Sequence, residues 1–168
     1  DILREIDRNA ILPEDLRQRL GRGVILSFSL STVDETLARI FEPGAPPPKD
    51  RLETMRECKG HGFLTGTNFI PVLPFLSDSD EQLERMMRAA KDHGSDFVLV
   101  GGLTLFGDGP TDSKTLYYGI LERHFPELVP KYRSLFGSFL APSSEYQKAL
   151  EGKARRLCEK VGMRYGII

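Results

Sequence analysis

Polar or conformationally restricted residues recur where strand-like apolar runs of the sequence end. The set consists of Ser29, Thr32, Glu42, Arg51, Asn68, Pro71, Pro74, Gly101 and Gly102. Because α/β folds bring the C-terminal ends of parallel strands to one edge, we expect these residues to face one pocket. Serine and asparagine side chains bind ribose hydroxyls or the polar end of an amino acid, and arginine binds a carboxylate through two parallel hydrogen bonds.

A packing interpretation of the same residues stays open. Ser29 is small enough to be required by barrel packing, and the prolines stiffen turns. Glu42 and Arg51 can also pair with each other as a clamp across the proline-rich loop. The residue types alone do not separate a ligand pocket from a structural clamp.

Other chemical motifs are weaker. His61, His93 and His124 stand alone, without the HxxxH or HExxH spacing of a zinc site, so we predict no metal ligand among them. Cys58 and Cys158 each fall on the apolar stripe of a predicted helix, where we expect small buried hydrophobic side chains. No segment matches the phosphate-binding pattern GxxxxGK[ST].

Strand and helix patterns alternate along the chain, which is typical of a parallel α/β sheet or barrel. The predicted strands cover residues 24–30, 63–70, 97–100 and 163–168. The predicted helices cover residues 2–6, 13–20, 32–40, 48–60, 78–90, 116–121, 127–136 and 146–161. Thr32 with Glu35 forms a capping-box pattern at one helix start. Asp78 with Glu81 is expected to cap another.

The first predicted strand carries different residue types on its two faces. Leu26, Phe28 and Leu30 alternate with Ser27 and Ser29, so the serines share the opposite face. A parallel strand buried on both faces is apolar on both. The serines therefore predict that one face borders a polar cavity or lumen.

The composition narrows the class of protein. The 168 residues include 23 Lys and Arg against 24 Asp and Glu, 40% hydrophobic residues and 28% charged residues, which fits one globular domain. The balanced charge gives no support for tight non-specific DNA binding. Two cysteines far apart are typical of a reducing compartment, so we expect a cytoplasmic protein. No apolar run approaches the about 18 residues of a membrane span, so no membrane association is expected.

Three ordered loops carry a family resemblance. The residues are Phe-Ser-Leu-Ser-Thr-Val-Asp at 28–34, Glu-Pro-Gly-Ala-Pro-Pro-Pro at 42–48 with Arg51-Leu52, and the segment from Gly62 through Pro71-Val-Leu-Pro74 to Asp78. They resemble the later half of radical S-adenosylmethionine (SAM) proteins, and most closely the spore photoproduct lyase-like branch, often labelled DNA repair photolyase. The similarity is dense from about residue 23 to residue 105 and thins beyond it.

The resemblance implies a partial (βα) barrel of the radical SAM type, of which residues 1–168 form a half-barrel in a single domain. The barrel strands and helices would cover about 23–105, and C-terminal helices would form an extension over 106–168. Such proteins bind SAM beside a [4Fe–4S] cluster and cleave SAM reductively to a 5'-deoxyadenosyl radical, which abstracts hydrogen from the substrate. Their CxxxCxxC cluster motif is absent from this sequence, so the ligands are expected outside this chain, which alone would be inactive.

The resemblance also implies roles for individual residues. Ser29 matches a serine near the ribose or methionine part of SAM, and Arg51 matches the arginine after the glutamate-proline loop. Pro71 opens the strand exit whose backbone lies beside the adenine in relatives. Asn68 departs from the apolar residues usual at its position, and Ser27 shares the face of Ser29. These five residues are the candidate SAM-binding set, while catalytic residues and the substrate stay unassigned.

The residues and the family resemblance leave three functions open. The first is a radical SAM enzyme with nucleic acid as one candidate substrate. The second is a non-catalytic α/β binding or interaction module that retains the barrel half. The third is a conventional barrel enzyme with a phosphate-bearing substrate. Because a half-barrel leaves a strand edge unpaired and its lumen side exposed, we expect the fragment to dimerise or to swap elements.

Overall fold

The computed structural model describes residues 2–168, and its centre is a parallel sheet. The strands lie in the order β1 (Ile25–Ser29), β2 (Leu64–Val72), β3 (Phe97–Gly102) and β4 (Arg164–Tyr165), and every neighbouring pair is parallel. The helices are α1 (Ile2–Asn9), α2 (Glu14–Leu20), α3 (Glu35–Phe41), α4 (Pro48–Gly60), α5 (Asp80–Asp92), α6 (Ser113–His124), the 3₁₀ helix η1 (Pro126–Leu128), α7 (Val129–Phe136) and α8 (Ser144–Val161). The predicted α/β class is therefore confirmed.

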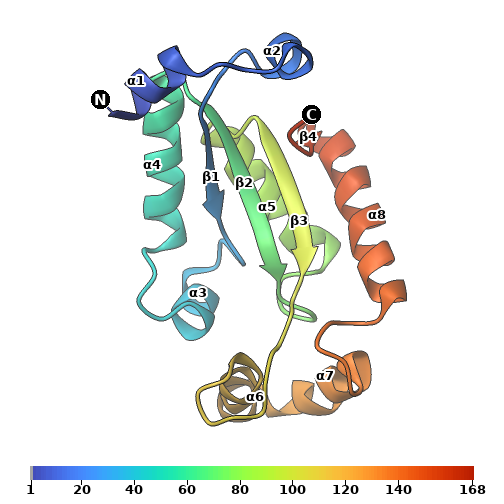
Figure 1. Ribbon diagram of the computed structural model, residues 1–168. Helices are drawn as coiled ribbons and strands as arrows, with labels where there is room; N and C mark the ends of the chain where they lie inside the picture. Colours follow the sequence, from blue (N-terminus) through green and yellow to red (C-terminus); the bar gives the residue numbers. More distant parts are fainter. Residues whose placement is uncertain (1) are drawn as a thin grey trace.

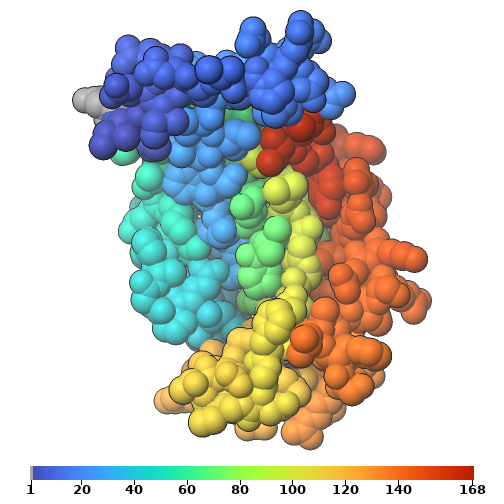
Figure 2. Space-filling model, viewed as in Figure 1, coloured from blue at the N-terminus to red at the C-terminus, as the bar shows by residue number. Residues whose placement is uncertain are grey.

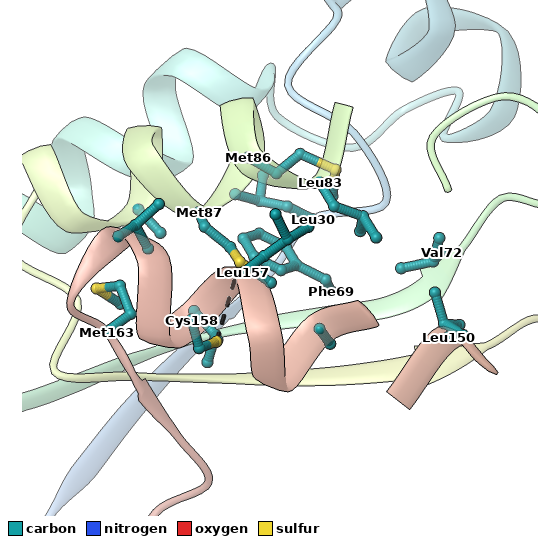
Figure 3. Packing of buried hydrophobic residues seen from close by; sticks show 14 of the residues in the cluster. Leu30, Phe69, Val72, Leu83, Met86, Met87, Leu150, Leu157, Cys158 and Met163 are labelled. Carbon is teal, nitrogen blue, oxygen red and sulfur yellow. Dashed lines mark hydrogen bonds between the residues drawn. The ribbon is translucent and has the colours of Figure 1, made fainter. Parts of the chain in front are cut away.

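Helices α4, α5 and α8 pack against one face of the sheet. The side chains of Phe28, Phe69 and Val98 point to this face and join a core with α4, α5 and α8. Figure 3 shows α5 and α8 meeting over this core, where Cys158 Sγ lies 3.9 Å from Met87 Sδ. Cys158 is 1% exposed, as predicted, and burial raises the pKa of its thiol to about 11. Cys58 on α4 was also predicted to be buried in the core, but it is only half-buried and lies outside this cluster.

The opposite face of the sheet carries no helix among the described residues. In Figure 1 strands β1 to β3 are seen in front of α5, and in Figure 2 their atoms form the visible surface between α4 and α8. Ser27 and Ser29 are exposed on this face, as the alternation predicts, and Ile70 is 47% exposed. We call it the open face.

Phe97 closes the N-terminal part of the open face. Gly66 pairs with Phe97 in the sheet register, and the fully buried phenyl ring lies where a side chain on Gly66 would stand. A Cβ atom on Gly66 would come within 2.1 Å of Phe97 Cζ. The absence of a side chain at residue 66 thus allows this ring to pack on the sheet.

A second hydrophobic cluster lies beyond the C-terminal ends of the strands. Leu73, Leu103 and Leu105 leave the sheet and pack with α6, η1 and α7 around Tyr132. Figure 1 shows these helices below the sheet, while α8 returns beside β3 and leads to β4. The region predicted as a helical extension, 106–168, therefore divides between this cluster and the sheet layer.

Two helix caps differ from the predicted positions. Asp34, and not Thr32, caps α3, because its carboxylate accepts from the backbone N–H groups of Thr36 and Leu37 at 2.8 and 3.0 Å. The Thr32 hydroxyl instead accepts from Asp34 N–H at 3.0 Å. Likewise, Ser79 and not Asp78 caps α5, since its hydroxyl accepts from Gln82 N–H.

Strand β2 continues two residues beyond its predicted end. Pro71 was predicted in a rigid exit after the strand, and it lies inside β2 instead. The β2–β3 register is irregular between Phe69 and Val72. Such an irregularity tolerates a residue that has no N–H to donate to the neighbouring strand.

Asp7 connects α1 to the start of β1. Its carboxylate accepts from Gly23 N–H at 2.8 Å, Val24 N–H at 3.0 Å and the Arg22 guanidinium at 2.9 Å. Burial alone would raise the pKa of Asp7, but the hydrogen bonds from Val24, Arg22 and Gly23 outweigh it and hold this pKa below its ordinary value. The ionised form is thus favoured in the folded state.

We expect Asp7→Asn to destabilise the fold by about 1–2 kcal/mol at pH 7, because the amide cannot replace every charge-assisted hydrogen bond. A lowered folded-state pKa stabilises the protein above the unfolded-state pKa of about 4 and loses this effect as pH falls through the folded-state value. Urea unfolding of both proteins at pH 7 and pH 3 measures the difference. Asp15→Asn on α2 is the exposed control, and a gap that stays constant with pH contradicts the assignment.

Candidate functional site

An ion pair between Glu42 and Arg51 joins the end of β1 to the loop between α3 and α4. Arg51 Nη2 donates to Glu42 Oε2, and Arg51 Nη1 donates to the Ser29 carbonyl at 2.5 Å. Glu42 Oε1 accepts from Ser31 N–H at 3.1 Å and from the Ser31 hydroxyl. The Arg51 and Glu42 side chains are only 16% and 20% exposed. The pairing that the sequence left open is therefore present, and it holds the backbone of Ser29 in place.

Local features set up this clamp. The Asp34 cap starts α3, which brings Glu42 to the C-terminal end of that helix. Pro48 occupies the first position of α4, where its fixed φ favours helix formation, so Arg51 follows one turn later. The intervening proline-rich loop encloses a cavity of about 360 Å³, and Glu42 and Arg51 line its wall.

Ser29 and Asn68 lie side by side on the open face at the C-terminal half of the sheet. They pair in the parallel register of β1 and β2, and Leu30 N–H donates to the Asn68 carbonyl at 2.9 Å. Ser27 lies two residues earlier on the same face, beside Gly66. The predicted serines and asparagine thus occupy one surface.

Two buried polar atoms near the end of β1 have no partner. Within residues 2–168, Asn68 Oδ1 and Arg51 Nε are the buried side-chain nitrogen or oxygen atoms that form no hydrogen bond. One is an acceptor and the other is a donor. Leaving such groups unpaired costs about 1–3 kcal/mol each, so both indicate a place where a polar ligand would be stabilising.

The other predicted residues have different surroundings. Pro71 is half-buried within β2, three residues beyond Asn68. Thr32 is buried, and its hydroxyl is engaged with Asp34. Gly101 on β3 is close to Ile70, because a Cβ atom on Gly101 would lie 3.1 Å from Ile70 Cγ1.

Three tyrosines support the loop after β2, and no local sequence pattern points to them. Tyr132 donates to the Pro74 carbonyl at 2.6 Å and shares a hydrogen bond with Tyr117. Tyr146 donates to Asp78 at 2.7 Å. Burial raises the pKa of all three phenols, so each remains protonated and can donate at neutral pH.

Phe75 stands in the same loop with left-handed backbone geometry. Its φ angle is 63°, which is uncommon for a bulky residue, and its N–H donates to Asp78 at 2.9 Å. The phenyl ring is 43% exposed, meets Tyr132 edge-on and has the Lys131 ammonium 5.9 Å from its centroid. This loop therefore presents an aromatic ring at the C-terminal edge of the sheet.

Across the described residues, no group of three or more His, Cys, Asp and Glu side chains is arranged to hold a metal ion. Within the same residues, no helix combines the length and apolar character needed to cross a bilayer.

Three proteins that are similar to this chain each carry the description uncharacterized protein. Rv2578c of Mycobacterium tuberculosis (strain ATCC 25618 / H37Rv) is 33% identical over 139 residues, which is 82% of this chain and 39% of that protein. Mb2609c of Mycobacterium bovis has the same identity and coverage. ORF301 of Acidianus two-tailed virus is 40% identical over 87 residues, which is 50% of this chain and 29% of that protein.

No protein-family model matches the chain, and no solved structure matches it significantly. The chain spans between 29% and 39% of the length of these curated relatives. The similarity therefore concerns only a part of each of these longer relatives.

Proposed function

We propose that the chain is the C-terminal half of a radical SAM barrel, of the spore photoproduct lyase-like type, and supplies part of the SAM-binding surface. One observation carries the proposal: within residues 2–168, helices cover one face of the parallel sheet and leave the other uncovered. Parallel sheets are ordinarily covered on both faces. A half-barrel exposes its inner face when the remaining strands of the barrel belong to another part of the protein. The relatives are long enough to contain such strands, because the match covers only 39% of Rv2578c.

The polar atoms on and near the open face fit SAM. The unpaired Asn68 Oδ1 would accept from an ammonium or hydroxyl group of the ligand, and the Ser29 hydroxyl would bind beside it. Arg51 Nε–H is a free donor for the carboxylate, while its Nη atoms stay with Ser29 and Glu42. Ser27 and the Pro71 backbone extend this surface along β1 and β2.

The residues of this chain do not fit the cluster. A [4Fe–4S] cluster is held by cysteine thiolates. Cys158 is buried between α5 and α8, and Cys58 lies on α4, where burial raises its pKa. The ligands belong to the part of the protein outside this chain, and when bound the cluster supplies the electron that cleaves SAM. Two free thiols are typical of a protein in a reducing compartment, so we include a cytoplasmic location in the proposal.

The proposal assigns no substrate. Nucleic acid is a candidate substrate only because members of the family are often labelled DNA repair photolyase. The formal net charge of -1 gives nucleic-acid binding no electrostatic support. A non-catalytic module that retains the barrel half is the alternative outcome of the test below.

The test uses the protein encoded by the complete gene, reconstituted anaerobically with iron and sulfide. We expect SAM to bind in calorimetry and to yield 5'-deoxyadenosine when dithionite is added. Asn68→Leu should leave thermal stability unchanged or raised, since it removes an unpaired buried atom, and should weaken SAM binding about tenfold. Asn68→Asp is a second variant, in which a negatively charged carboxylate replaces the side-chain amide.

Arg51→Ala should also weaken SAM binding about tenfold, and Arg56→Ala on the exposed side of α4 should not. Unchanged SAM affinity in both Asn68→Leu and Arg51→Ala would remove these residues from the site. A complete protein that neither binds nor cleaves SAM would overturn the proposal and favour the non-catalytic module.

A further inference from the structure

A groove between α3 and α6 lies apart from the open face. Its volume is about 620 Å³, and the two helices are neighbours at the lower left of Figure 1. On α6 the lining residues Leu116, Gly119, Ile120 and Arg123 recur at helical spacing, so they form one stripe. On and after α3, Ile40 and Pro43 belong to an equivalent stripe. Two helical stripes thus make the walls of the groove.

The apolar floor of the groove is not covered by any part of the described chain. Leu116 lines the groove on α6 and is 54% exposed. Next to it, Gly119 has no atom within 4 Å of the position that its Cβ would occupy. Glycine inside a helix is less favourable than alanine, so the described fold gains nothing from this missing side chain. The space beside residue 119 is therefore open to a side chain of a ligand.

The charged side chains that line the groove are those of Arg39 and Arg123, and His124 also borders it. No acidic residue of the described chain is among the lining residues. Within residues 2–168, neither arginine takes part in an ion pair, and Arg39 Nη2 only donates to the Thr36 hydroxyl at 3.3 Å. Three acids adjoin lining residues in the sequence: Glu35 and Glu122 are exposed, and Glu42 is paired with Arg51. An acidic ligand would complement this rim.

We propose that the α3–α6 groove binds an acidic peptide segment of a partner protein, with a leucine-type anchor over Gly119 and carboxylates against Arg39 and Arg123. A helix laid in an apolar groove is a common mode of peptide recognition. Nucleic acid fits less well, because no Phe, Tyr or Trp of the described chain lines the groove and His124 is its one aromatic ring among those residues. This proposal is independent of SAM binding, since the groove shares neither Ser29 nor Asn68.

The test titrates the full 168-residue chain with the fluorescein-labelled peptide EELLEELLEE at low salt and follows anisotropy. Shifts of backbone amide signals in nuclear magnetic resonance spectra should map to α3 and α6. The peptide KKLLKKLLKK and a thymidine oligonucleotide of similar length are the competing ligands. We expect the acidic peptide to bind at least about tenfold more tightly than either, with an affinity that falls as salt rises.

Two variants test the groove itself. Gly119→Met fills it in a helix position that accepts a side chain, and it should weaken acidic-peptide binding about tenfold without loss of fold. Gly152→Met on α8 is the matched control, because residue 152 also has open space and lies outside the groove. Arg39→Glu with Arg123→Glu should abolish the preference for the acidic peptide.

Three results would overturn the proposal. They are acidic-peptide binding no tighter than that of the basic peptide, tighter binding of the oligonucleotide, and unchanged binding in Gly119→Met. Circular dichroism and thermal unfolding of each variant separate lost binding from lost structure.

Discussion

Gly66→Ala is expected to lower the free energy of unfolding by about 3 kcal/mol or more, through a clash with one aromatic ring. The new Cβ atom would stand 2.1 to 2.5 Å from three ring atoms of Phe97, which is fully buried. Either the ring or strands β2 and β3 must move. Urea unfolding followed by circular dichroism measures the loss.

Phe97→Leu supplies the partner test for this clash. Alone it should destabilise the protein, because it removes buried ring atoms. Combined with Gly66→Ala it should cost clearly less than the sum of the two single changes, since the smaller side chain relieves the clash. Gly60→Ala, where no atom lies within 4 Å of the new Cβ, is the control. Additive losses in the double variant would show that Phe97 is not the obstacle.

Glu42→Ala is the second change with a large expected effect, a loss of about 3 kcal/mol. It leaves the Arg51 guanidinium without its carboxylate and the Ser31 N–H and hydroxyl without their acceptor. Removing one member of a largely buried pair is costly because the remaining charge stays poorly solvated. Chemical denaturation at pH 7 gives the difference.

Glu53→Ala on α4 is the matched control. Glu53 pairs with Arg56 at 3.4 Å, but their side chains are 44% and 54% exposed, so the expected loss is below about 1 kcal/mol. Similar losses for Glu42→Ala and Glu53→Ala would mean that the clamp does not stabilise the end of β1. Glu42→Gln keeps an acceptor for Ser31, so its loss of stability should lie between those of Glu42→Ala and Glu53→Ala.

The alternation of residue types was sufficient to predict that the two faces of β1 differ in polarity. Ser27 and Ser29 alternate with Phe28 in β1, and a strand must place them on opposite sides. The strand positions followed from apolar runs bounded by glycine and proline. Whether helices cover the face that carries the serines depends on residues distant in sequence. The alternation of residue types within one strand contains no information about those residues.

Local competition explains the wrong cap positions. Thr32 and Asp34 are both good capping residues two positions apart, and the helix begins after the one whose carboxylate reaches two N–H groups. Asp78 and Ser79 present the same choice. Asp78 is instead engaged by Phe75 and Tyr146, and the latter contact joins residues 68 positions apart.

The candidate site was predictable only in part. Residue types placed Ser29, Asn68 and Arg51 near the ends of strands, and the structure brings them to one region. The sequence allowed Arg51 to hold a ligand or Glu42, because both uses require the same guanidinium. The contact between Tyr132 and the Pro74 carbonyl spans 58 positions and leaves no local pattern.

The DNA sequence of the natural gene upstream of the codon for residue 1 tests the central claim most directly, over about 150 codons, the usual size of a domain. The account predicts an open frame in which CxxxCxxC follows a strand-like apolar run, which would place the cluster ligands in the other half of the barrel. A frame that starts at or just before residue 1, or one without the three cysteines, would contradict it.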